Sequence, residues 1–206
     1  MSTIRFHKGD LPDLAHYNVD AVAIDTETLG LNPHRDRLCV VQISPGDGSA
    51  DVIQIAAGQK EAPNLVALLR NEAITKLFHF ARFDLAVLYK SFGVMAGPAF
   101  CTKIASRLTR TYTDRHGLKD ICNELLGVSI SKQQQSSDWA AENLTPEQLE
   151  YAASDVLYLH QLHDVLAGRL ARENRVDEAN ACFRFLPTRA KLDLMGWDET
   201  DIFAHS

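Results

Sequence analysis

Short runs of apolar residues in the first half of the chain predict β-strands. Residues 21–24 (Ala-Val-Ala-Ile) lead into Asp25 and then into the turn-forming sequence Leu-Gly-Leu-Asn-Pro, a pattern typical of a strand that ends in a loop. Residues 38–43 and 50–55 are two further β-rich runs, and the Pro-Gly-Asp-Gly sequence between them suits a hairpin loop. The pattern predicts three antiparallel strands, followed by a short strand at residues 76–80.

Apolar positions at helical spacing predict helices elsewhere. The expected helices cover residues 62–70, a segment around residues 83–88, and residues 102–108, 118–126 and 146–170. The last of these has the clearest start, because Thr145 can cap the first turn, Pro146 suits the first helical position and Gln148 completes a capping box. The second half of the chain is therefore expected to be mainly helical, with the polar segment 129–137 as a loop.

The composition is that of an ordinary globular protein of 206 residues, 46% hydrophobic and 23% charged, and this length favours one domain. No run approaches the about 20 apolar residues of a membrane span, and the N-terminus lacks the apolar core of a secretory signal. A cytoplasmic protein with no membrane partner is expected. The cysteines are far apart and form no C-x-x-C pair, so we expect reduced core thiols. They are Cys39, Cys101, Cys122 and Cys182.

The net charge of −6 argues against a protein that coats nucleic acid nonspecifically, because phosphate binding normally relies on a basic face. It does not exclude a nuclease whose clustered acids are neutralised by divalent cations. A local basic rim could still guide a strand, although lysines and arginines are more often simply solvated surface. The candidate rim consists of Arg82, Lys103, Arg107, Arg110, Arg115, Lys119 and Lys132.

The first candidate for chemistry is the pair Asp25 and Glu27 at the end of the predicted strand. Side chains two apart on a strand project to the same face, so both carboxylates can bind one cation. Hard oxygen donors suit Mg²⁺ or Mn²⁺. Alone, such a pair is also found in ordinary solvent-facing turns.

Two further segments carry acids. Tyr151 and Asp155 are four apart in the expected long helix and so share one face; the alternative is an exposed acid beside a half-buried tyrosine. Asp84 falls in the first turn of a helix, where the helix dipole alone would favour a carboxylate. His79 and Phe80, at the end of the preceding strand, are equally well explained as core residues.

Together these residues resemble the DEDDy exonucleases, which carry the motifs Asp25-Thr-Glu27, Asp84 and Tyr151-x-x-x-Asp155 in this order and approximate spacing. The chain is similar to the catalytic domain of ribonuclease D over about residues 20–170. The resemblance implies an α/β, ribonuclease H-like fold with a mixed five-stranded sheet flanked by helices. Ribonuclease D itself continues into helical nucleic-acid-binding domains, whereas this sequence ends at Ser206. We therefore expect a single exonuclease domain, residues 1–206, with no additional helical nucleic-acid-binding domain.

The resemblance further implies the activity and the cofactors. We expect a 3′-5′ exonuclease that acts on single-stranded 3′ ends, RNA rather than DNA, and releases nucleoside 5′-monophosphates. Two divalent ions, Mg²⁺ or Mn²⁺, would activate the attacking water and stabilise the leaving oxygen, with Asp25 as the bridging ligand. The expected catalytic and metal residues are Asp25, Glu27, Asp84 and Asp155, with Tyr151 as a further catalytic residue.

Tyr151 is expected to orient the attacking water, because a phenol with an unperturbed pKa of about 10 is a poor base at neutral pH. Polymerase proofreading domains usually carry asparagine four residues before the third acid. Phe80 stands at that place and cannot make the same hydrogen bond to a terminal nucleotide, but aromatic rings can stack on any base. The expected substrate contacts are Thr28, Leu29, His79, Phe80 and Phe83.

Two other classes of function remain open. One is a catalytically silent nucleic-acid-binding protein of the same fold, which the presence of all five motif residues disfavours. The other is a small-molecule phosphohydrolase that uses the same carboxylates but has no groove for several nucleotides. Hydrolysis of oligonucleotides but not mononucleotides would separate the exonuclease from the phosphohydrolase.

Overall fold

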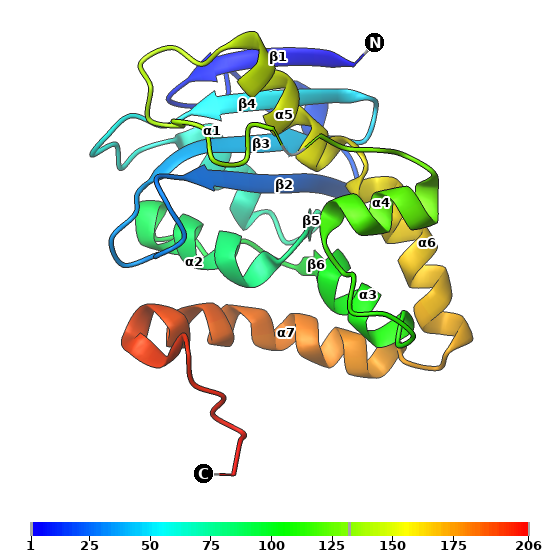
Figure 1. The fold of residues 1–206 in the computed structure, drawn as a ribbon. Helices are drawn as coiled ribbons and strands as arrows, with labels where there is room; N and C mark the ends of the chain where they lie inside the picture. Colours follow the sequence, from blue (N-terminus) through cyan, green and yellow to red (C-terminus); the bar gives the residue numbers. More distant parts are fainter. Residues whose placement is uncertain (1, 132, 206) are drawn as a thin grey trace.

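The computed structural model describes residues 2–131 and 133–205, which form a six-stranded mixed sheet with helices on both faces (Figure 1). The spatial order is β1-β4-β3-β2-β5-β6. As the sequence predicts, β2, β3 and β4 are antiparallel neighbours, and the α/β, ribonuclease H-like fold class is confirmed. The strands are β1 (Thr3–Lys8), β2 (Ala21–Thr28), β3 (Leu38–Ser44), β4 (Ser49–Gln54), β5 (Thr75–Phe78) and β6 (Ala99–Cys101).

The expectation of five strands is wrong, because the described sheet has six, and the predicted strands include neither edge strand. β1 has the sequence TIRFHK, a short alternation of apolar and charged residues that is typical of a half-exposed strand. β6 has only three residues. Each pairs in parallel with one neighbour, β1 with β4 and β6 with β5. Because the paired strands are distant in the sequence, no turn sequence joins them and predicts the pairing.

The helices agree closely with their predicted positions, except in the last third of the chain. They are α1 (Pro63–Arg70), α2 (Ala81–Phe92), α3 (Thr102–Thr109), α4 (Leu118–Leu126), α5 (Pro146–Leu157), α6 (Leu159–Arg172) and α7 (Val176–Leu192). In Figure 1, α5 lies in front of β3 and β4, and α1 lies behind them. The predicted capping box is confirmed: the hydroxyl of Thr145 accepts from the backbone N–H of Gln148, whose side chain accepts from the N–H of Thr145 at 2.9 Å.

The prediction of one continuous helix over residues 146–170 is wrong, since the chain breaks at Tyr158 between α5 and α6. The sequence around the break, Ser-Asp-Val-Leu-Tyr-Leu-His, contains neither glycine nor proline. Packing explains the break: α5 lies against β3 and β4, whereas α6 packs on α3 and α4. Asp155 therefore lies in the last turn of a helix held on the sheet.

The second half of β2 is open on one side. Its parallel pairing with β5 ends where Ala23 meets Leu77, while its pairing with β3 continues to Thr28. Among the described strands, β3 is therefore the only neighbour of β2 beyond Ala23. The first turn of α2 approaches this open edge, since Asp84 there accepts a hydrogen bond from Thr26. The acidic end of β2 is therefore paired with a strand on one side only, and Asp84 lies near its other side.

A buried lysine fixes the start of β5. The side chain of Lys76 is fully buried, and its ammonium group donates to the carbonyl oxygens of Ile74 and Gly97, both at 2.8 Å, and to that of Asn71. Lys76→Met leaves three carbonyls without this donor, so we expect a loss of about 3 kcal/mol of unfolding free energy. Urea denaturation measures it. The exposed Lys60 provides the control, and equal stability of Lys76→Met and Lys60→Met would contradict this role.

The core includes residues from both faces of the sheet, and three of the four cysteines are buried in it. All four are free thiols, as predicted, but the expected core position is wrong for Cys182, which is exposed. None of the helices in the described part of the chain combines the length and the apolarity that crossing a bilayer requires.

Candidate active site

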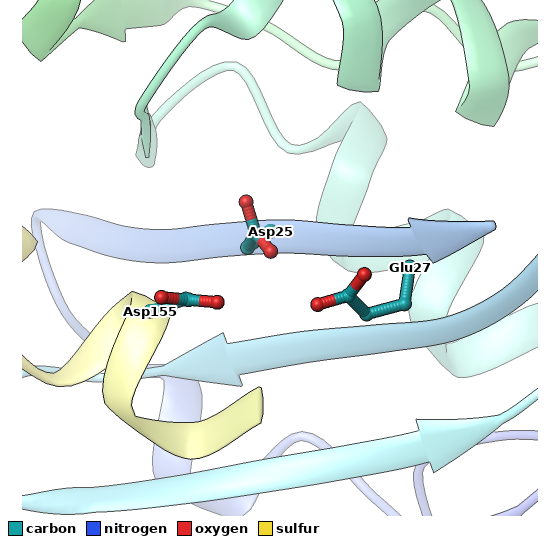
Figure 2. A group of neighbouring side chains, drawn as sticks. All are labelled: Asp25, Glu27 and Asp155. Carbon is teal, nitrogen blue, oxygen red and sulfur yellow. The ribbon is translucent and has the colours of Figure 1, made fainter. Parts of the chain in front are cut away.

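Three carboxylates converge above the middle of the sheet (Figure 2). Asp25 and Glu27 project from β2, and Asp155 reaches them from the last turn of α5. One oxygen from each lies within 4.8 Å of the others. The alternation of side chains along β2 places Asp25 and Glu27 on one face. The packing of α5 on the sheet brings Asp155 to the same place.

The fourth acid, Asp84, lies beside this group. It is in the first turn of α2 and is buried, and its Oδ1 accepts a hydrogen bond from the hydroxyl of Thr26 at 2.7 Å. The charge of Asp84 raises the pKa of Asp25 more than that of either other acid does, which is consistent with close approach. All four predicted acids are therefore neighbours in the folded chain.

Burial and mutual repulsion hold protons on this cluster. Burial, followed by the charges of the other three acids, raises the pKa of Asp25 well above its usual range. Burial, and then the charges of Asp155 and Asp84, raise the pKa of Glu27 to about 9. Burial raises the pKa of Asp84 to about 7, although the hydroxyl of Thr26 opposes the shift. A divalent cation would stabilise the ionised forms, and an all-carboxylate donor set fits a hard cation such as Mg²⁺.

These pKa values predict that the metal-free protein loses stability as the pH rises. In the unfolded chain both Glu27 and Asp84 are ionised above about pH 5, but the folded protein keeps their protons until the raised pKa values are reached. The folded state then binds more protons, so stability falls with rising pH up to about pH 9. Melting temperatures in a chelator should fall from about pH 6 to about pH 9, and Mg²⁺ should restore them. A Glu27→Gln variant should show a weaker slope; an unchanged slope would refute this origin.

Tyr151 lies one turn before Asp155 on α5. Burial, and then the charges of Asp155, Glu27 and Asp25, raise the pKa of its hydroxyl, so the phenol stays protonated at neutral pH. Its ring packs on Trp139, with centroids 5.9 Å apart. Trp139 is buried. The Ser-Asp-Trp sequence contributes to the family resemblance, but nothing in it indicates contact with Tyr151, so the sequence assigns Trp139 no role in the site.

The predicted substrate contacts divide into exposed and inward-facing residues. Leu29 is 54% exposed and Phe80 is 44% exposed. Phe80 has a φ of 73°, a left-handed conformation that bulky non-glycine residues rarely adopt. The hydroxyl of Thr28 donates to the carbonyl of Gly30 at 2.5 Å. The two exposed apolar side chains are therefore the accessible members of the set.

His79 and Phe83 face inward. The hydroxyl of Thr102 donates to the carbonyl of Phe78, so its oxygen accepts from Nδ1 of His79 at 2.9 Å. Burial lowers the pKa of His79 to about 3, which keeps the ring neutral. Phe83 is half-buried and packs against the main core. The packing explanation of His79 therefore fits its surroundings better than a substrate contact does.

The candidate basic rim is wrong for Arg110, and three of its members have acidic partners among the described residues. Arg110 is fully buried and cannot guide a strand. Lys103 does face the site region, with its ammonium group 4.4 Å from the centroid of the Phe80 ring. Lys132 lies outside the described residues. The ion pairs are Arg82 with Asp193, Arg110 with Glu124, and Arg115 with Asp120.

A mixed sheet of this order, with four neighbouring carboxylates and a tyrosine one turn before the last, is the arrangement expected of the 3′-5′ exonuclease class. A sequence model of the 3′-5′ exonuclease family matches residues 14–171. The chain therefore belongs to the 3′-5′ exonuclease family, and its acidic cluster fits an enzyme that depends on a divalent metal.

Known relatives are consistent with this assignment. Ribonuclease D of Acidiphilium cryptum is 36% identical over 156 residues, which is 76% of this chain but 39% of that protein. The chain thus spans about two fifths of the length of the curated relatives it matches. Escherichia coli RNase D is structurally similar, with a TM-score of 0.77 and 28% identity over 86% of this chain and 46% of that chain.

Other solved structures match over the full length. Brucella melitensis NrnC with bound Mg²⁺ is 74% identical, with a TM-score of 0.96, over 99% of this chain and 100% of that chain. Brucella melitensis NrnC bound to pGG is 75% identical, with a TM-score of 0.98, over 100% of both chains.

Proposed function

We propose that this chain removes nucleotides one at a time from the 3′ ends of single-stranded RNA, in preference to DNA, and releases nucleoside 5′-monophosphates. The observation that carries the proposal is the convergence of Asp25, Glu27 and Asp155, with Asp84 beside them. The ribonuclease D relatives support RNA as the substrate class. The pGG-bound relative, which matches along its whole length, supports short RNA in particular.

We propose that the four acids hold two divalent ions, Mg²⁺ or Mn²⁺. Asp25, Glu27 and Asp155 would bind one ion, and Asp25 and Asp84 would bind the other. Bound there, the ions supply a stronger water nucleophile and stabilise charge on the leaving 3′ oxygen. The Mg²⁺-bound relative supports this choice of metal. The raised pKa values support it as well, because they mark carboxylates that lack a counter-charge.

The hydroxyl of Tyr151 orients the attacking water. Its raised pKa keeps it protonated, so it serves as a hydrogen-bond donor and not as a base. Contact with Trp139 holds the ring on the side of α5 that carries Asp155. Phe80 and Leu29 contact the terminal bases, since their side chains are exposed at the ends of β2 and β5, and stacking on Phe80 tolerates any base.

We treat residues 1–206 as one exonuclease domain. Support comes from the position of α7, which lies outside the residues matched by the family model but packs on α2, α3 and β6. Asp193, the residue that follows α7, also accepts a hydrogen bond from Arg82, two residues before Asp84. The C-terminal segment is thus part of the support of the active site.

Product analysis tests the proposed function. A short single-stranded RNA labelled at its 5′ end, and its DNA counterpart, are incubated with the protein and Mg²⁺. We expect the labelled RNA to shorten stepwise from its 3′ end and nucleoside 5′-monophosphates to accumulate. The RNA should be hydrolysed faster than its DNA counterpart. Internal cleavage, or release of phosphate from mononucleotides, would overturn the exonuclease proposal; faster hydrolysis of DNA would overturn the RNA preference.

A further inference from the structure

Gln42, on β3, lies directly opposite Asp25 of β2 in the antiparallel ladder. Directly opposed residues of such a pair project to the same face, with Cβ atoms about 4.5–5.5 Å apart. The amide of Gln42 is therefore placed beside Asp25, on the face that α5 covers. This is also the face on which the three carboxylates converge (Figure 2).

Gln42 is fully buried, and neither atom of its side-chain amide has a hydrogen-bond partner among the described residues. Buried amides almost always have partners, because burial without them costs free energy. Val40, two residues earlier on the same strand, is apolar and buried, as is Val52, the partner of Gln42 on β4. An apolar side chain would suit this position better if packing were its only task.

Carboxylates that bind metal ions are themselves held by hydrogen bonds from neighbouring groups, which fix their orientation. We infer that Gln42 is a positioning residue for the metal site, whose amide N–H donates to the Asp25 carboxylate when that carboxylate binds a divalent ion. The inference rests on the proposed function, since it assigns Asp25 to the metal. Gln42 does not touch the substrate; it acts through Asp25.

Gln54 on β4 provides a matched control. It lies opposite Val40 in the ladder, and therefore on the same face as Gln42. Its amide nitrogen, however, has a partner, since Nε2 donates to the carbonyl of Ala141 at 2.8 Å. Removing the two amides should therefore affect different properties. Loss of the Gln42 amide should weaken metal binding, and loss of the Gln54 amide should lower stability.

The test compares Gln42→Met with Gln54→Met, since methionine preserves side-chain length without the amide. Mn²⁺ affinity is measured by calorimetry without substrate, and melting temperature is measured in a chelator. For Gln42→Met we expect an unchanged or higher melting temperature and about 10-fold weaker Mn²⁺ binding. For Gln54→Met we expect a melting temperature lower by about 2–4 °C and wild-type Mn²⁺ affinity.

Wild-type Mn²⁺ affinity in folded Gln42→Met would overturn the inference. If that variant does not fold, Gln42→Leu provides the same comparison, and a melting temperature lowered in both variants would assign Gln42 a structural role instead. Asp25→Asn separates the two proposals. If Asp25→Asn leaves Mn²⁺ binding intact, the proposed metal site itself fails; if Asp25→Asn abolishes binding but Gln42→Met does not weaken it, only the role of Gln42 fails.

Discussion

Asp155→Asn is expected to slow hydrolysis at the 3′ end of RNA by at least about 1,000-fold, which corresponds to about 4 kcal/mol of transition-state stabilisation. Asp155 offers one of the three carboxylate oxygens that lie within 4.8 Å of one another, and an amide is a much weaker ligand for Mg²⁺. The fold should be preserved, because the change removes one of several acids that raise the pKa of their neighbours.

Single-turnover hydrolysis of labelled RNA at saturating Mg²⁺ measures this effect. Asp164→Asn is the control, because Asp164 lies on α6 with a side chain that is 82% exposed, and it should keep wild-type activity. A rate for Asp155→Asn within about tenfold of the wild type would show that this carboxylate is not needed for the chemistry.

Asp193→Ala is expected to lower the unfolding free energy by about 3 kcal/mol. Asp193 is 4% exposed. Its carboxylate accepts from Arg82 at 2.8 Å and from Arg189 at 2.9 Å, and its carbonyl contacts a ring nitrogen of His34 at 3.0 Å. Without the carboxylate, two partly buried guanidinium groups lose their acidic partner, and the segment that follows α7 loses this attachment to α2.

Urea denaturation of Asp193→Ala, Asp193→Asn and Asp198→Ala tests this role. Asp193→Asn keeps acceptor capacity and should lose less stability than Asp193→Ala. Asp198 is exposed and only its carbonyl oxygen contacts Arg82, so Asp198→Ala should stay within about 0.5 kcal/mol of the wild type. Equal stability of all three variants would mean that the Arg82–Asp193 contact adds nothing to the fold.

The convergence of the four acids could be predicted only by combining local patterns with the family resemblance. Asp25 and Glu27 follow an apolar strand, and Tyr151 and Asp155 are spaced by one helical turn. The family resemblance supplied what local pattern could not, namely that Asp84 and Asp155 meet Asp25 in space. The break at Tyr158 was missed because no residue near it disfavours helix; tertiary packing alone separates α5 from α6.

Contacts that depend on register or on distant pairing could not be predicted. Gln42 appears as an ordinary strand residue until the ladder places it opposite Asp25. Arg110 appears as a surface cation until the fold buries it against Glu124. The positions of the basic residues in the sequence therefore predicted a larger basic rim than the fold allows. The polarity of Gln42 alone gave no reason to single it out.

The most direct test of the central claim is anomalous diffraction at the manganese absorption edge. Crystals would contain the wild-type protein, Mn²⁺ and a short RNA with an uncleavable terminal linkage. We expect two peaks, one among Asp25, Glu27 and Asp155 and one between Asp25 and Asp84, both next to the terminal phosphate. No peak at these acids, or peaks only elsewhere, would contradict the account.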